Sequence, residues 1–316
     1  MKKIQMTAKQ APTLQECIRD FERRCIANNL SEQSIATYNV HCGLFAVFAG
    51  AEDTPITELP QNVTEGFIAH LKQERRCSDA TVLSYMRTIR VFLYYCMEME
   101  YVAPYKIKLP KAEKKIKETY TDAELAALLK KPDIKKCGFT EYRIWVYSTY
   151  LLATGNRIST ALNIRLCDLD FDNGLIQLNT MKNRKAQIIP MSDTLRQILR
   201  EYLSYRQGAS DDYLFCNACG GQADKRTYQE GLAAYNRARG VKKTSAHLYR
   251  HTFAKKWIMN GGDVFRLQKL LGHSDLTITR EYVNMFSVDL SQNYSQFNPL
   301  DTMKINSGAE RIRMAG

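Results

Sequence analysis

Four short motifs of this chain carry side chains that together can act on a phosphodiester. A Thr-Gly-Asn-Arg run near the middle ends at Arg157, and a His-Leu-Tyr-Arg motif runs from His247 to Arg250. A Leu-Gly-His motif ends at His273, and a Thr-Arg-Glu-Tyr motif ends at Tyr282. The arginines can fork onto a phosphate, the histidines can transfer protons, and the tyrosine offers an oxygen nucleophile. One such motif means little, but four in this order are a strong signal.

Local patterns indicate where these side chains sit. His247 and Arg250 are three residues apart on an expected helix and share a face, whereas the adjoining His251 is expected to point elsewhere. Arg157 follows a glycine that ends a helix, and His273 opens a helix near whose end the tyrosine lies. Taken singly, each histidine is as well explained as a buried structural residue.

The helical patterns divide the chain into five parts. These are a flexible lead at 1–12, a four-helix unit at 13–102, a basic linker at 103–118, a second unit at 119–300 and a tail at 301–316. Thr13 opens a capping box, and apolar residues recur at helical spacing as far as Ile26. Three more helices are expected after Ser31, from about Asn62 and from Ser78.

The linker is extended and basic. Pro104 and Pro110 bracket a run whose lysines are Lys106, Lys108, Lys111, Lys114, Lys115 and Lys117. Prolines at this spacing favour an extended chain. The segment is either a solvated tether or a strap along a phosphate backbone, where counterion release favours binding.

The second unit is predicted to be mainly α, with a small antiparallel three-stranded sheet. Thr121 opens another capping box, and a helix near 140–154 ends at Gly155. Asp172-Asn173-Gly174 is a good hairpin turn. The expected strands are 169–171, 175–178 and 187–189, and the later helices lie near 193–206, 227–239, 246–260, 263–271 and 275–284.

Composition favours an anionic binding partner and a location inside the cell. Lysine and arginine total 45 against 33 acidic residues, giving a net charge of +12. No apolar run approaches the length of a membrane helix, and no signal peptide is expected. Nine cysteines, an odd number, indicate reduced thiols in the cytosol. Cys216 and Cys219 have metal-like spacing but no second pair, which favours a turn over zinc; no metal or cofactor is expected.

With these motifs in place, the chain resembles the tyrosine recombinases of the phage-integrase, Xer and Cre type. The resemblance covers nearly the whole length, and the step of 23 residues from Arg250 to His273 matches the family. It implies a helical core-binding domain at 13–102 and a catalytic domain of the DNA breaking-rejoining fold at 119–300.

The resemblance also assigns roles. Both arginines match those that grip the scissile phosphate, both histidines match catalytic positions, and Tyr282 matches the nucleophile. The family's catalytic lysine lies in a β-hairpin, where Lys182 matches best and Lys185 is the alternative. Two fixed guanidiniums would stabilise the charge that develops on the phosphate. His247 would take the tyrosine proton and the lysine would protonate the leaving 5′ oxygen, giving a 3′-phosphotyrosine without metal or ATP.

One position departs from the family. An acidic residue often stands three positions after the first arginine, and here that position is Thr160. A hydroxyl adds no charge, so Asp168 and Asp170 are the candidates to compensate.

The expected partner is double-stranded DNA. The linker lysines and, on the fourth helix, Thr81, Arg87 and Arg90 are the candidate contacts. Recombination in this family needs four protomers on two duplexes, with a C-terminal segment, here Phe286 to Met303, packed on a neighbour or docked in cis. Accessory DNA-bending or excision factors are further expected partners, and no membrane is.

Within the family, the integrase of a mobile element is favoured. The chain enters the helical unit by residue 13, so no arm-binding domain is expected, and Asn156 and Thr160 differ from Xer enzymes. An Xer-like resolvase of chromosome or plasmid dimers is the alternative. Two other classes are a non-catalytic DNA-binding protein of the same fold and a type IB topoisomerase. The expected location is the bacterial cytoplasm, at the nucleoid.

Overall fold

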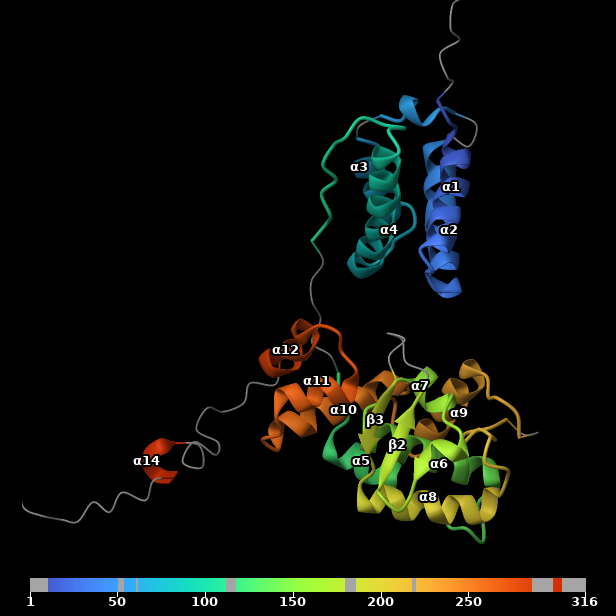
Figure 1. Ribbon diagram of the computed structural model, residues 1–316, viewed down its shortest axis with the longest axis vertical. Coiled ribbons are helices and arrows are strands. Elements are labelled where there is room, and N and C mark those ends of the chain that lie inside the picture. The colour runs from blue at the N-terminus through green and yellow to red at the C-terminus, as the bar shows by residue number, and fades with distance from the viewer. Residues whose placement is uncertain are drawn as a thin grey trace, which may run out of the picture. The chain divides into compact units, whose positions relative to one another are not determined.

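The computed structural model describes residues 11–50, 54–60, 62–111, 118–179, 186–217, 220–285 and 298–302. The chain divides into two compact units, Met1–Lys115 and Ile116–Gly316 (Figure 1). Most of the expected lead and tail lies outside the described residues.

The N-terminal unit contains the four predicted helices. Its elements are α1 (Leu14–Ala27), α2 (Glu32–Ala49), the short 3-10 helix η1 (Ile56–Glu58), α3 (Val63–Gln73) and α4 (Asp79–Glu98). Thr13 closes a capping box with Glu16, and Ser31 and Ser78 cap α2 and α4 through their side chains. These caps were predictable because each depends only on residues within one turn.

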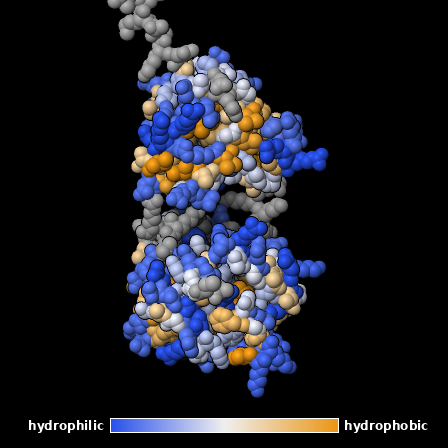
Figure 2. All heavy atoms as spheres, turned by 90° about the vertical axis from the view of Figure 1, so that its right-hand side faces the viewer, coloured by the Kyte–Doolittle hydropathy of each residue, from blue (hydrophilic) through white to orange (hydrophobic). Residues whose placement is uncertain are grey.

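Aromatic and aliphatic side chains from all four helices form the core of this unit. Phe21, Phe45, Phe67 and Phe92 are buried at its centre. Ile26, which the apolar spacing placed in the core, is 60% exposed instead. Its neighbour in the chain is buried, and one residue further along a helix turns the side chain about 100° away. Hydrophobic areas of this unit's surface are visible between hydrophilic ones in Figure 2.

Part of the predicted linker packs on the N-terminal unit. Ile107 is buried in its core, and Tyr105 and Leu109 pack against that core. Lys106 and Lys108 alternate with them and are exposed, as an extended chain requires.

The second unit contains a three-stranded antiparallel sheet, as predicted. Its strands are β1 (Leu169–Asp170), β2 (Leu175–Leu178) and β3 (Gln187–Pro190), in the order β1-β2-β3. Ile176 pairs with Leu169 on one side and Ile189 on the other. At the turn, the Asp170 carboxylate accepts the backbone N–H groups of residues 172 and 173, at 3.1 and 2.9 Å.

The helices of this unit are α5 (Asp122–Leu129), α6 (Phe139–Thr154), α7 (Ile158–Leu162), the 3-10 helix η2 (Leu166–Asp168), α8 (Asp193–Arg206), α9 (Lys225–Ala238), α10 (Ala246–Met259), α11 (Val264–Leu271), α12 (Leu276–Met285) and α14 (Pro299–Thr302). Buried side chains of α5 to α10 form the main core together with those of the sheet. Helix α6 is central, since it contacts α5, α8, α9 and α10 (Figure 1). It buries side chains on nearly every face, including Trp145, Tyr147 and Tyr150.

A smaller apolar cluster joins α10, α11 and α12. It contains Ala254, Ile258, Leu267, Leu271 and Tyr282. The tyrosine of the last motif therefore enters the protein interior on an apolar support, next to the helix that carries His-Leu-Tyr-Arg.

Candidate active site

Arg250 is the hub of the site. Its side chain is 5% exposed and donates to the carbonyls of Gly155 (2.9 Å) and Leu271 (2.7 Å). The same guanidinium lies 2.8 Å from Nε2 of His273. Burial, followed by the charge of Arg157, lowers the pKa of Arg250 to about 10. It therefore remains a cation at neutral pH, and three separated motifs meet around it.

Gly155 allows this meeting. It ends α6 with φ +63°, a left-handed conformation that favours glycine. A Cβ here would lie 2.5 Å from Phe253 Cδ1 and 2.9 Å from Leu271 Cδ2. Both the backbone and the space therefore require glycine at the point where its carbonyl holds Arg250.

Arg157 supplies a second cation. It is the N-cap residue of α7 and is half-buried. Burial lowers its pKa, and Tyr282 opposes that shift. The Arg157 charge in turn depresses the pKa of Arg250, so the two guanidiniums sense one another. Two like charges held together favour an anion between them.

His273 bridges Arg250 and α12. Its Nδ1 lies 2.9 Å from Oγ1 of Thr279, which is fully buried. An arginine can only donate, so Nε2 must accept from Arg250 and the ring proton sits on Nδ1. His273 is therefore neutral in this arrangement, and its tautomer is fixed by its neighbours.

Tyr282 lies beside both groups. It is 2% exposed, and its ring is parallel to that of His273, with centroids 6.4 Å apart. Its hydroxyl is 2.8 Å from Nδ1 of His251. Burial raises the pKa of Tyr282, while the Arg250 and Arg157 charges oppose that rise. The cations thus act directly on the oxygen that is the candidate nucleophile.

His247 occupies the first turn of α10 and is exposed. Burial of part of the ring, followed by the charges of Arg250, Lys225 and Arg157, lowers the pKa of His247. The His247 imidazole is therefore neutral at pH 7, and the charges of Arg250 and Arg157 act on it.

The expectation that His251 points away from the site is wrong. His247, Arg250 and His251 stand at positions i, i+3 and i+4 of α10. Both of these spacings place side chains on one helix face, so the signal was present in the sequence. What the sequence did not show is that α12 brings Tyr282 to that face.

Both candidate lysines, Lys182 and Lys185, lie outside the described residues. The residues flanking their hairpin are described. Asn179 donates to Asp168 at 2.6 Å, and Gln187 donates to the carbonyl of Lys269 on α11. The start of β3 is thus held two residues from Leu271, whose carbonyl accepts from Arg250.

Thr160 is buried on α7. The acids considered as its replacements are used locally. Asp168 accepts from the backbone N–H of Arg165 and from Asn179, at 2.8 and 2.6 Å, and Asp170 closes the β1–β2 turn. Both carboxylates are therefore engaged in local hydrogen bonds of their own.

The candidate DNA contacts are only partly brought together. Lys106, Lys108 and Lys111 are exposed, whereas Lys114, Lys115 and Lys117 lie outside the described residues. On α4, Arg87 and Arg90 are three residues apart and share a face. Thr81 lies on a different face and bonds the capping Ser78 at 2.9 Å, so it belongs to the helix start.

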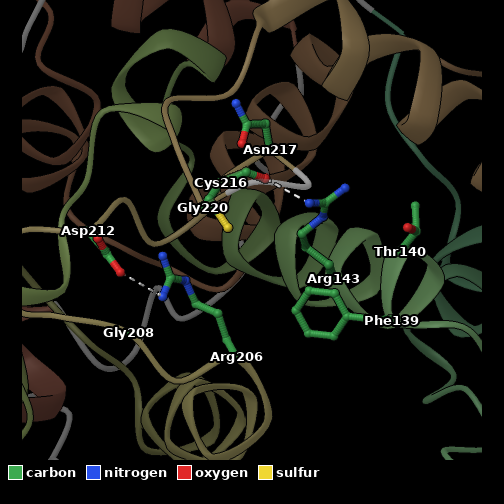
Figure 3. Close-up of a pocket in the computed structure, with 9 residues that line it drawn as sticks. All are labelled: Phe139, Thr140, Arg143, Arg206, Gly208, Asp212, Cys216, Asn217 and Gly220. Carbon is green, nitrogen blue, oxygen red and sulfur yellow. Dashed lines mark hydrogen bonds and ion pairs between the residues drawn. The ribbon is translucent and has the colours of Figure 1, made fainter.

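The second unit also contains a cavity of about 350 Å³, and none of the catalytic candidates lines it (Figure 3). Arg143 and Arg206 line it, and Arg143 precedes Gly155 by 12 residues of α6, or about 18 Å. Arg143 donates to the Cys216 carbonyl at 2.7 Å, and Arg206 lies 3.6 Å from Asp212. Both arginines therefore hold the 206–217 segment in place.

Among the described residues, no three His, Cys, Asp or Glu side chains cluster as metal ligands. Cys216 is buried, Cys219 is outside the described residues, and Asn217 closes a turn with Gly221 at 2.9 Å. None of the described helices combines the length and apolar character needed to cross a bilayer.

Comparison with known proteins gives matches that cover both units. The family model "Phage integrase family" matches residues 118–287, and "Phage integrase SAM-like domain" matches residues 13–116. Similar curated proteins include tyrosine recombinase XerD of Listeria monocytogenes, 27% identical over 90% of this chain and 99% of the relative. XerD of Oceanobacillus iheyensis is 25% identical over the same shares.

Similar solved structures show the same fold. A Tn1549 transposon integrase in complex with a circular intermediate DNA has a TM-score of 0.72 and 19% identity, covering 85% of this chain and 94% of that chain. A lambda integrase dimer bound to a COC′ core site has a TM-score of 0.69 and 14% identity, covering 86% and 95%.

Proposed function

Because this chain belongs to the phage integrase family, we propose that it is a site-specific DNA recombinase that cuts and rejoins strands through Tyr282. The observation that carries the proposal is the meeting of Arg250, His273 and Tyr282 from separate motifs. Arg250 contacts His273 directly, and its charge acts on the tyrosine. All three residues are among those to which the family resemblance assigns catalytic roles.

The two arginines would bind the scissile phosphate. Attack at phosphorus adds negative charge to the non-bridging oxygens, and fixed guanidiniums stabilise that charge. Arg250 is held by two carbonyls and His273, so little reorganisation is needed when the phosphate arrives. His273 and His247 would complete the phosphate site.

Each strand cut moves one proton off the nucleophile and one onto the leaving group. The Tyr282 oxygen bonds to phosphorus while the bond from phosphorus to the 5′ oxygen breaks. Lys182, or Lys185 in its place, would protonate that oxygen as a general acid. The resulting 3′-phosphotyrosine retains the bond energy, so the 5′ hydroxyl can reverse the step without ATP.

Both units would contact the duplex. Exposed Lys106, Lys108 and Lys111 would neutralise backbone phosphates together with the remaining linker lysines. Arg87 and Arg90 on one face of α4 are candidates for further contacts. The proposal includes four protomers on two duplexes, the segment from 286 to 303 packing in trans, and accessory DNA-bending factors. Its expected place is the bacterial nucleoid.

Integration and excision of a mobile element is the favoured role, and the fold likeness to a transposon integrase is consistent with it. Resolution of chromosome or plasmid dimers is the second candidate, favoured by the relatives named XerD. Strand exchange between two directly repeated chromosomal sites, without the ends of any element, would distinguish resolution from integration.

Covalent trapping tests the reaction. Duplexes that bind the Tyr282→Phe protein are first selected from a library of random sequences. The selected duplexes are nicked and mixed with the wild type or with Tyr282→Phe in a buffer that contains a metal chelator. We expect a denaturant-resistant protein–DNA adduct with the wild type alone. An equal adduct with the variant would overturn the nucleophile, and tight binding without any adduct would favour a non-catalytic DNA-binding protein.

A further inference from the structure

We propose that His251 is a catalytic residue, the proton acceptor for Tyr282 during strand cleavage. This rests on the proposed role of Tyr282 as nucleophile. It replaces the sequence-based assignment of that step to His247. The two histidines are one helical turn apart on α10, so the question is which ring meets the phenol.

Geometry favours His251. Its Nδ1 lies 2.8 Å from the Tyr282 hydroxyl, and the two rings have centroids 5.7 Å apart. Helices α10 and α12 pack together here, so the contact joins two fixed elements. Within the described residues no hydrogen bond joins His247 to Tyr282. His247 is exposed at the start of α10, near the position expected for the phosphate.

The charges around the phenol favour transfer of its proton to His251. Burial raises the pKa of Tyr282, while Arg250 and Arg157 both act to lower it. A neutral histidine carries its ring proton on one nitrogen and accepts at the other, so the tautomer protonated at Nε2 accepts the phenol O–H at Nδ1, 2.8 Å away. In that tautomer the phenol proton is directed at His251 before any bond to phosphorus forms.

The charged groups around the tyrosine assist this transfer. Arg250 faces it from α10 and Arg157 from the start of α7, while Glu281 on α12 opposes them. As the Tyr282 oxygen attacks, the O–H bond breaks and the proton moves to Nδ1. A separate acid protonates the 5′ oxygen. When the 5′ hydroxyl later attacks the phosphotyrosine, the imidazolium returns its proton to the departing phenolate, so His251 ends unchanged.

The test uses single-turnover adduct formation on the selected duplexes. His251→Ala is expected to slow it by about 10²- to 10³-fold. His251→Asn retains a polar atom near the place of Nδ1 but no basic nitrogen. It should bind DNA normally, cleave slowly and lose the rise of rate with pH through the range in which histidines titrate, about 5.5 to 7.5. His247→Asn should retain that rise.

A second substrate separates the two proton transfers. Sulfur in place of the 5′ bridging oxygen gives a leaving thiolate that needs no proton. The loss in His251→Ala should persist on this duplex, whereas the loss in Lys182→Ala should be largely restored. Rescue of His251→Ala by sulfur would overturn the proposal, because His251 would then serve the leaving group.

Controls separate the two levels of failure. Each His251 variant must have the melting temperature and the DNA affinity of the wild type. If His251→Ala does not fold, the proposal is judged on His251→Asn, which is the milder change. If the wild type forms adducts and both variants do so within about threefold, the role of His251 is wrong while Tyr282 stands. If the wild type forms none, or Tyr282→Phe does, the proposed function fails, and the His251 proposal fails with it.

Discussion

Two buried histidines, one in each unit, have the same local partner and different surroundings. In the N-terminal unit, Nδ1 of His41 lies 2.9 Å from Oγ1 of Thr88, and the ring packs on Tyr85 with centroids 4.0 Å apart. In the second unit, Nδ1 of His273 lies 2.9 Å from Oγ1 of Thr279, and Nε2 meets Arg250. The histidine–threonine pair is a packing device in both. Reactivity comes from what the other face of the ring meets.

The largest expected effect comes from removing the hub of the reactive site. Arg250→Lys cannot satisfy two carbonyls and His273 at once, because an ammonium lacks the planar fork. We expect single-turnover adduct formation to fall by about 10³-fold. Arg143→Lys is the matched control, since Arg143 is also buried and bonded to a carbonyl. Arg143→Lys should lower the melting temperature and leave the rate of adduct formation by the folded protein unchanged. Equal rate losses in Arg143→Lys and Arg250→Lys would contradict the view that Arg143 lies outside the active site.

The paired histidine variants sharpen the comparison directly. Asparagine preserves a polar atom for the threonine but removes the Nε2 group. His273→Asn should slow adduct formation about 10²-fold. His41→Asn should cost about 1–2 kcal/mol in the free energy of unfolding and leave the rate of folded protein unchanged. Stopped-time denaturing gels and urea titrations measure the two quantities. A rate loss in His41→Asn equal to that in His273→Asn would show that the distinction is mistaken.

A glycine pair tests the packing that assembles the site. Gly50 and Gly155 both end helices with left-handed backbones, at φ +59° and +63°. No described atom lies within 4 Å of a Cβ at Gly50, whereas Phe253 would lie 2.5 Å from one at Gly155. Gly50→Ala should cost about 1 kcal/mol and Gly155→Ala about 3 kcal/mol in chemical denaturation. Similar losses of unfolding free energy in the two variants would mean that the side chains of Phe253 and Leu271 move aside at little cost.

The smallest effect is a pH dependence of stability. Burial lowers the pKa of His41, so the folded state holds its proton less well than the unfolded chain. Below about pH 6.5 the unfolded state binds more protons, and stability present above that pH is lost as pH falls through the folded pKa. His41→Asn should flatten this part of the curve of unfolding free energy against pH. A residual slope is expected from His247, whose pKa is also lowered.

The features that the sequence predicted well are those set by neighbouring residues. Capping at Thr13 and Thr121 needs only a glutamate three positions on, and both boxes form. The β1–β2 turn depends on Asp170 to Gly174 and was equally local. The catalytic candidates were predicted from the order of the motifs and from the family resemblance. Neither requires knowledge of contacts between distant residues.

The features that were missed depend on packing between distant segments. Ile107 sits in a basic, proline-bracketed run, and only the apolar core it enters shows that the run is docked. Nothing in the sequence distinguishes Thr279 from other polar residues. Only the packing of α12 shows that its hydroxyl contacts His273. His251 differs from these, because its i+4 spacing from His247 already places the two histidines on one face of α10.

The most direct test is to locate the covalent bond. Adducts of the wild type with a selected duplex would be digested with nuclease and trypsin and analysed by mass spectrometry. Cleavage after Arg280 gives a peptide from Glu281 to Lys304, in which Tyr282 should carry a 3′-linked nucleotide. A nucleotide on Tyr294, the other tyrosine of that peptide, or on any other peptide would contradict the account.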